Sequence, residues 1–232
     1  MYYIHYFKKL GSTNDRVKKF KKECSVVVAE IQTKGRGRFK RKWSSGKGGL
    51  WLSILLKPKN IGKLGYLTFS AAVACQRAVK KAAGIESKVK WPNDLVIGKK
   101  KLCGILTESG FGTKKFAVVG IGMNTNNKIP ENLKENAISL SNILGKEVNN
   151  KELINCLLNE FELLYKKLNN REYNFILKEW KKLSDTLGRD VKVITRNKVL
   201  IGKAIDVDDD LRLIIKTANN TLDKVTEGDV LY

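Results

Sequence analysis

The sequence predicts an α+β protein with a central β-sheet, flanking helices and a small C-terminal β-barrel. Residues 1–186 alternate apolar runs of strand length with stretches of helical periodicity, which is typical of a sheet covered by helices. From Gly188 onward the pattern changes, because four or five short strands crowd into the last part of the chain. We therefore expect a main domain over residues 1–186 and a β-barrel domain over residues 187–232.

The N-terminal elements are a short aromatic strand over residues 2–7, a helix that runs to about Lys22, and a strand over residues 26–31. Ser12, followed three residues later by Asp15, forms a helix start that resembles a capping box. The hydroxyls of Ser12 and Thr13 therefore have two interpretations. They either cap the helix, which the sequence alone favours, or face a polar ligand beside the exposed N–H groups of the helix start.

A long loop, QTKGRGRFKRKWSSGKGG, follows over residues 32–49. A loop of such length inside a compact domain is usually a functional lid or a disordered segment. Its glycines allow close approach to a ligand, and Arg36, Arg38 and Arg41 supply forked cationic donors that suit phosphate or carboxylate. Trp43 offers a flat face on which a base could stack. The loop therefore predicts a lid that handles a nucleotide, with a solvated basic loop as the alternative.

The middle of the chain begins with an apolar strand over residues 50–56 and a helix whose face of small residues suits tight packing on a sheet. The block KWPNDLVIGKKKLCGILTESG, residues 90–110, then predicts a β-hairpin that turns at Gly98 and Lys99. Because successive side chains of a strand point to opposite faces, Lys99 and Lys101 face away from their immediate neighbours, and one of them can point inward. A lysine buried in this way needs an anion as its partner. An exposed edge lysine is the alternative that the sequence alone favours.

The segment FAVVGIGM, residues 116–123, is apolar enough to be a fully buried strand. Gly120 and Gly122 within it indicate close backbone approach. Asn124 stands at the end of this strand, where it is either a ligand contact or a turn residue. No glycine pair completes a dinucleotide fingerprint and no Walker A sequence is present, so those two nucleotide sites are excluded. Two amphipathic helices, near residues 153–168 and 173–187, are expected to supply ordinary core.

A formal net charge of +22 favours polyanions or acidic partners, so a nucleic-acid-binding protein is one hypothesis. The basic residues are nevertheless spread along the chain, without a basic tail. The four cysteines are far apart, which argues against a zinc site or a disulfide scaffold and favours reduced thiols in the cytoplasm. His5 is the only histidine and is interpreted as structural. The sequence predicts no signal peptide and no membrane span.

Four segments together resemble the biotin protein ligases, also called biotin–[acetyl-CoA-carboxylase] ligases. The segments are GSTN at residues 11–14, residues 32–43, KWPNDLVIGKKKLCGIL at residues 90–106, and GIGMN at residues 120–124. Their order matches as well, and the resemblance extends over the whole chain. It implies a mixed central sheet. The sequence begins at the catalytic domain, without the N-terminal winged helix of some relatives, so no specific DNA binding is expected.

The resemblance implies a two-step ligation. The carboxylate of biotin attacks the α-phosphate of ATP and gives biotinyl-5′-AMP and pyrophosphate, with Mg²⁺ as the metal. A lysine of a biotin carrier domain then attacks the mixed anhydride and releases AMP. The resemblance further implies a cytoplasmic homodimer. A lipoate–protein ligase is the nearest alternative enzyme.

The same resemblance implies roles for individual residues. The biotin-binding residues would be Ser12, Thr13, Asn14, Gln32, Gly35, Arg36, Gly37, Arg38, Lys101 and Gly104. The ATP-binding residues would be Arg36, Arg38, Arg41, Trp43, Asn93, Lys101 and Asn124. Lys101, Arg36 and Arg38 would be catalytic, with Lys101 bridging the carboxylate and the α-phosphate. Asp94 would organise the Mg²⁺ ion.

Overall fold

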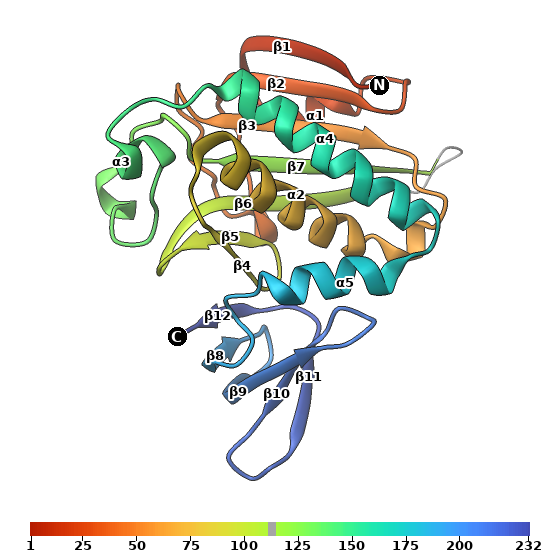
Figure 1. The fold of residues 1–232 in the computed structure, drawn as a ribbon, viewed down its shortest axis with the longest axis vertical. Coiled ribbons are helices and arrows are strands. Elements are labelled where there is room, and N and C mark those ends of the chain that lie inside the picture. The colour runs from red at the N-terminus through yellow and green to blue at the C-terminus, as the bar shows by residue number, and fades with distance from the viewer. Residues whose placement is uncertain (111–114) are drawn as a thin grey trace.

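The computed structural model describes residues 1–110 and 115–232 and contains two β-sheets (Figure 1). The larger sheet has seven strands in the order β1-β2-β3-β7-β6-β5-β4. They are β1 (Tyr3–Leu10), β2 (Ser25–Gln32), β3 (Leu50–Leu56), β4 (Lys88–Lys90), β5 (Asp94–Ile97), β6 (Lys100–Gly110) and β7 (Phe116–Met123). The sheet is mixed, because β1 runs parallel to β2 and all other neighbouring strands are antiparallel.

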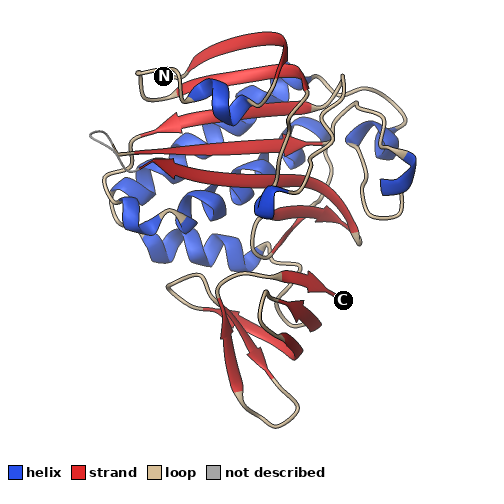
Figure 2. Ribbon diagram, turned by 180° about the vertical axis from the view of Figure 1, so that it is seen from behind, coloured by secondary structure: helices blue, strands red, loops and turns tan. Residues whose placement is uncertain are grey.

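Three long helices cover one face of this sheet, as Figures 1 and 2 show. They are α2 (Gly65–Ala83), α4 (Asn150–Asn169) and α5 (Tyr173–Lys182). Small buried residues along α2, such as Ala71, Ala74 and Ala78, allow close packing in the core, and Phe69 stacks on Trp180 of α5 with ring centroids 4.4 Å apart. In the part of the chain that the structure describes, no helix has the length and apolar character needed to cross a membrane.

The other face of the sheet carries the short helix α1 (Thr13–Val17) (Figure 2). Val17 packs with Val27, Leu55 and Val118 in a small separate cluster. The helix is shorter than the sequence predicts. Beyond Val17 the α-helix ends in a tighter turn. The N–H of Phe20 bonds to the carbonyl of Val17, three residues earlier, whereas an α-helix would use the carbonyl four residues earlier. The remaining short helix is α3 (Leu140–Leu144), and single 3₁₀ turns are η1 (Arg38–Lys40), η2 (Ile61–Lys63) and η3 (Glu131–Leu133).

Strand register gathers three glycines on the face that carries α1. Gly104 of β6 lies opposite Gly122 of β7, and Gly120 lies opposite Leu106. Directly opposed residues in antiparallel strands point to the same face, and so do residues two apart along one strand. The alternate residues, such as Ile105 and Ile121, belong to the core beneath the long helices. The glycines therefore leave a shallow floor on the α1 side of the sheet.

The smaller sheet is built from β8 (Asp190–Ile194), β9 (Val199–Val207), β10 (Leu213–Lys216), β11 (Leu222–Val225) and β12 (Asp229–Leu231). Its order is β11-β10-β9-β8-β12 and every pair is antiparallel. The predicted architecture, a helix-covered mixed sheet followed by a small all-β unit, is confirmed. The small unit is described by the structure as a five-stranded antiparallel sheet.

Candidate functional site

A cleft of about 540 Å³ lies on the glycine floor and is bounded by the long loop, the start of α1, the β5–β6 hairpin and the start of β12. Fourteen of the predicted site residues line it, from distant parts of the chain. They are Ser12, Thr13, Asn14, Gln32, Arg36, Gly37, Arg38, Arg41, Trp43, Asn93, Asp94, Lys101, Gly104 and Asn124. Gly35 does not line the cleft. It packs inside the loop, where a β-carbon would lie 2.5 Å from Ser45 Oγ.

The start of α1 forms an uncharged polar end of the cleft. Ser12 occupies the N-cap position, but its side chain makes no capping bond, so the capping interpretation is wrong. The backbone N–H and the hydroxyl of Thr13 both donate to Gln32 Oε1, at 2.7 and 2.9 Å. Ser53 Oγ lies 2.7 Å from Thr13 Oγ1 and donates to Asn14 Oδ1 at 2.6 Å. These fixed, nearly buried groups suit an uncharged polar ring.

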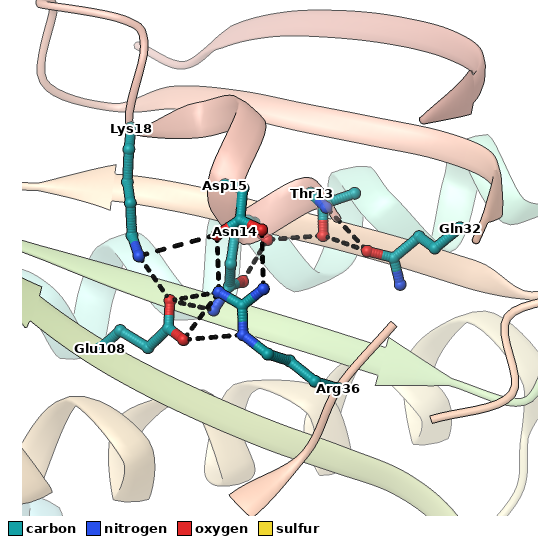
Figure 3. Close-up of polar contacts among 8 residues, drawn as sticks. Thr13, Asn14, Asp15, Lys18, Gln32, Arg36 and Glu108 are labelled. Carbon is teal, nitrogen blue, oxygen red and sulfur yellow. Dashed lines mark hydrogen bonds and ion pairs between the residues drawn. The ribbon is translucent and has the colours of Figure 1, made fainter. Parts of the chain in front are cut away.

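Arg36 does not point freely into the cleft. Its guanidinium lies between the carboxylates of Asp15 and Glu108, and Figure 3 shows all three side chains. Lys18 Nζ lies 2.9 Å from Glu108, and Asn14 Nδ2 donates to the same carboxylate at 3.1 Å. The hydrogen bond to Arg36 lowers the pKa of the Asp15 carboxyl. The structure thus adds Glu108 and Ser53 to the residues around the cleft.

Two other arginines connect the loop to the remainder of the cleft. Arg38 Nη1 donates to Asn93 Oδ1 at 3.2 Å and to the carbonyl of Gly228 at 3.4 Å. Burial lowers the pKa of Arg38, which means that its positive charge is only partly compensated in this surrounding. Arg41 makes a bidentate pair with Asp229 at 2.9 and 2.6 Å. The loop is therefore tied to β12 of the smaller sheet as well as to the hairpin.

Lys101 projects into the cleft from β6. Its backbone is held by the segment before α3, because its N–H donates to Asn136 at 2.8 Å and its carbonyl accepts from Ile138 at 3.1 Å. Its ammonium lies 2.7 Å from Asp94 Oδ2 and 5.2 Å from the ring of Trp43. The alternative of an exposed edge lysine is therefore wrong for Lys101. The cleft has a cation ready for an anionic ligand.

Trp43 rests on the glycine floor. A β-carbon at Gly122 would lie 2.5 Å from Trp43 Nε1, and one at Gly104 would lie 3.1 Å from the same ring. The indole N–H is buried and has no hydrogen-bond partner. Larger residues at either glycine would displace the ring, so the two glycines and the tryptophan fit one another. The loop reaches the floor of the cleft through this ring.

The two predicted asparagines are both held in place. Asn93 donates to the carbonyl of Ile105 at 2.8 Å while it accepts from Arg38. Asn124 accepts from Asn127 Nδ2 at 3.1 Å and lines the cleft. Hydrogen-bonded amides of this kind present fixed donors and acceptors to a ligand.

The donor set fits a magnesium ion only together with a phosphate ligand. Among residues 1–110 and 115–232, no three His, Cys, Asp or Glu side chains gather as a metal site. Asp94 Oδ1 is buried and without a hydrogen-bond partner, which leaves one carboxylate oxygen for an additional cation. Because Mg²⁺ is commonly held by one or two carboxylates plus substrate phosphates, Asp94 fits that role. The four cysteines are free thiols.

The cleft combines an uncharged polar end, a cationic middle formed by Arg38 and Lys101, and an aromatic side chain. This combination is suited to a ligase that brings a carboxylate and a nucleotide phosphate together. Residues 6–126 match the Biotin/lipoate A/B protein ligase family, and residues 186–231 match the Biotin protein ligase C terminal domain. The chain therefore belongs to the biotin/lipoate A/B protein ligase family, among its biotin protein ligases.

Individual relatives agree with this assignment. The chain is 36% identical over 215 residues to the bifunctional ligase/repressor BirA of Bacillus subtilis, a match that covers 90% of this chain and 66% of that protein. It is 29% identical to the biotin–[acetyl-CoA-carboxylase] ligase of Mycobacterium tuberculosis, over 89% of this chain and 78% of that one. The structure of the Aquifex aeolicus biotin protein ligase in complex with biotin and ATP is similar, with a TM-score of 0.89, 30% identity, and coverage of 99% of this chain and 97% of that chain. The chain spans slightly less than two thirds of the length of the Bacillus relatives.

Proposed function

We propose that this protein activates biotin with ATP as biotinyl-5′-AMP and then transfers biotin to a lysine of a biotin carrier domain of a carboxylase. One observation carries the proposal. Arg38 and Lys101 reach the adjacent residues Asn93 and Asp94, at 3.2 and 2.7 Å, so two cations approach the same part of the cleft. The carboxylate of biotin and the phosphates of ATP are all negatively charged and repel each other. Two convergent cations offset that repulsion.

In the first step, a carboxylate oxygen of biotin attacks the α-phosphorus of ATP, and the bond to the pyrophosphate oxygen breaks. We assign Lys101 and Arg38 to the two anionic groups at this point. Thr13 and Gln32 orient the ureido ring with Ser12 and Asn14, because their polar groups form the uncharged end. Asp94, together with ATP phosphates, would hold a magnesium ion, which would supply charge neutralisation.

In the second step, the amine of an acceptor lysine attacks the biotinyl carbonyl carbon, and AMP leaves with the bonding electron pair. Asn93, Asn124, Arg41 and Trp43 are assigned to the nucleotide. A lid that excludes water protects the mixed anhydride from hydrolysis. The contacts of the loop with Asp229 and with the glycine floor support this lid assignment. A homodimer and a cytoplasmic location, in keeping with four free thiols, are further parts of the proposal.

The transfer reaction tests the proposal. The purified protein is incubated with Mg-ATP, a biotin carrier domain from an acetyl-CoA carboxylase, and either labelled biotin or labelled lipoate. We expect label from biotin on the carrier domain, none from lipoate, and none on a carrier whose acceptor lysine is replaced by arginine. Preferential transfer of lipoate supports the lipoate–protein ligase alternative and contradicts the proposal. A DNA affinity that falls steeply with salt, together with no transfer, supports the nucleic-acid hypothesis.

A further inference from the structure

Both donor edges of the Arg36 guanidinium are occupied by hydrogen bonds within the protein. Asp15 takes the edge formed by the two terminal nitrogens, at 2.7 Å each. Glu108 takes the other edge, with Oε1 at 3.1 Å from Nε and 2.9 Å from Nη2. A guanidinium offers parallel pairs of donors along these two edges only. Arg36 in this position therefore has no free fork for a carboxylate or a phosphate.

Charge leads to the same conclusion. The cluster contains two cations, Arg36 and Lys18, and two anions, Asp15 and Glu108, all joined by ion pairs of at most 3.9 Å. Such a cluster is close to neutral, so it attracts an anionic substrate less than Arg38 does, whose hydrogen-bond partners are an amide and a carbonyl. The Arg36 and Glu108 side chains are 26% and 23% exposed, and pairs that are partly withdrawn from water are screened less than surface pairs.

Glu108 connects three elements. It extends from β6, four residues beyond Gly104 and thus on the cleft face of that strand. Its carboxylate receives Arg36 from the loop, Asn14 from α1 and Lys18 from the end of α1 (Figure 3). Asn14 in turn accepts from Ser53 of β3 at 2.6 Å. One carboxylate therefore fixes the loop and the polar end of the cleft relative to each other.

The protonation state supports this connection. Burial by itself raises the pKa of the Glu108 carboxyl, but hydrogen bonds from Lys18, Arg36 and Asn14 outweigh it, so that the pKa is lowered. The hydrogen bonds that Arg36 donates to Asp15 raise the pKa of Arg36. Both partners are thus charged at neutral pH, and their ion pair joins the loop to β6.

We propose that Glu108 is a positioning residue for biotin activation, and that Arg36 serves with it as the anchor of the lid instead of as a donor to the substrate. Glu108 and Asp15 hold Arg36, and through it the Gly35–Arg38 backbone, against α1. Glu108 also orients the Asn14 amide beside the ligand. The inference rests on the proposed function, and it changes the role that the sequence resemblance implies for Arg36.

Kinetics of biotin-dependent ATP–pyrophosphate exchange separate an anchor from a substrate donor. An anchor stabilises the enzyme–substrate complex and the transition state equally. Its loss therefore raises KM for biotin with little change in kcat. We expect Arg36→Gln and Glu108→Gln each to raise KM about tenfold and to change kcat less than about threefold. The double variant should be no worse than either single variant, because both remove the same contact. Lys18→Gln, the matched control, removes a cation from Glu108 without touching the loop and should leave KM within about twofold.

Hydrogen exchange of the ligand-free protein gives a readout that does not depend on activity. Glu108→Gln should reduce protection over Gly35–Arg38, whereas Lys18→Gln should not. Unchanged protection in a folded Glu108→Gln variant overturns the anchor. A fall in kcat of about 100-fold in Arg36→Gln, with parental kinetics in Glu108→Gln, also overturns it and identifies Arg36 as a substrate donor. Failure of the proposed function is distinct, because the parent protein would then show no biotin-dependent exchange while the loop contact could still be measured.

Discussion

The Lys101 ammonium and the Asp94 carboxylate form an ion pair of 2.7 Å at the floor of the cleft. The two residues come from the paired strands β5 and β6, and the backbone of Lys101 is fixed by the segment at residues 136–138. The pair places the lysine ammonium in the cleft, and it leaves one Asp94 oxygen without a partner. An anionic substrate bound in the cleft can therefore approach the Lys101 ammonium.

Replacement of this lysine should abolish most of the activity. In Lys101→Met the charge between the carboxylate and the α-phosphate is lost, and by analogy with a lost oxyanion donor the cost is about 3 kcal/mol of transition-state stabilisation, or roughly 100-fold in kcat. Biotin-dependent pyrophosphate exchange measures this. Lys100→Met is the matched control, because the Lys100 ammonium bonds to the carbonyl of Lys134. Equal activity of the two variants would show that Lys101 does not contact the reacting groups.

The glycine floor should not tolerate a side chain at residue 120. A β-carbon there would lie 2.1 Å from Asn14 Oδ1, so Gly120→Ala should displace Asn14 from Ser53. Overpacking of this kind costs about 1–3 kcal/mol of unfolding free energy, and we expect weaker biotin binding as well. Urea unfolding and calorimetry with biotin measure both. Gly11→Ala is the control, since its nearest neighbour would lie at 3.9 Å, and parental values for Gly120→Ala would contradict the packing described here.

Trp43 should report ligand binding. Trp51, Trp91 and Trp180 are all buried at 2% exposure or less, whereas Trp43 lies at the cleft surface of the loop. Addition of biotin and ATP should therefore change the tryptophan fluorescence, and Trp43→Phe should remove most of that change. Trp180→Phe, on the other side of the sheet, should lower total emission and preserve the change. If Trp43→Phe shows the same ligand-induced fluorescence change as the parent, the loop tryptophan does not respond to the ligand.

The contribution of Glu108 to stability should depend on pH in one direction. Its pKa is lowered in the folded protein, mainly by Lys18 and Arg36 against the effect of burial. A lowered carboxyl pKa gives stability that is complete above the unfolded value of about 4.3 and is lost as pH falls through the folded value. The difference in unfolding free energy between the parent and Glu108→Gln should thus stay constant from pH 7 to about 5 and shrink below about 4.3. A difference that disappears between pH 7 and 6 would contradict this account.

Sequence patterns predict those parts of the site that lie on recognisable segments. The loop arginines, Trp43 and the hairpin lysine are all visible in the sequence, and the structure brings them to one cleft. The capping interpretation of Ser12 is wrong, because a hydroxyl before a helix gives the same sequence pattern whether or not it caps.

Sequence patterns do not identify two residues that hold the cleft side chain Asn14, although each of the two carries a signal. Ser53 is the only polar side chain in the strand LWLSILL, and a buried hydroxyl needs a partner. Glu108 continues the alternation of Gly104 and Leu106 along β6. Its partners, however, are 72 and 94 positions away in the sequence. Such pairing depends on the order of the strands, which local periodicity does not contain.

Biotin-dependent exchange of labelled pyrophosphate into ATP measures the first step of the proposed reaction without an acceptor protein. We expect exchange by the purified protein with biotin and Mg-ATP, and none when biotin is left out or replaced by lipoate. Folded protein that catalyses no exchange with biotin, or that exchanges equally well with lipoate, would contradict the assignment of this cleft to biotin activation.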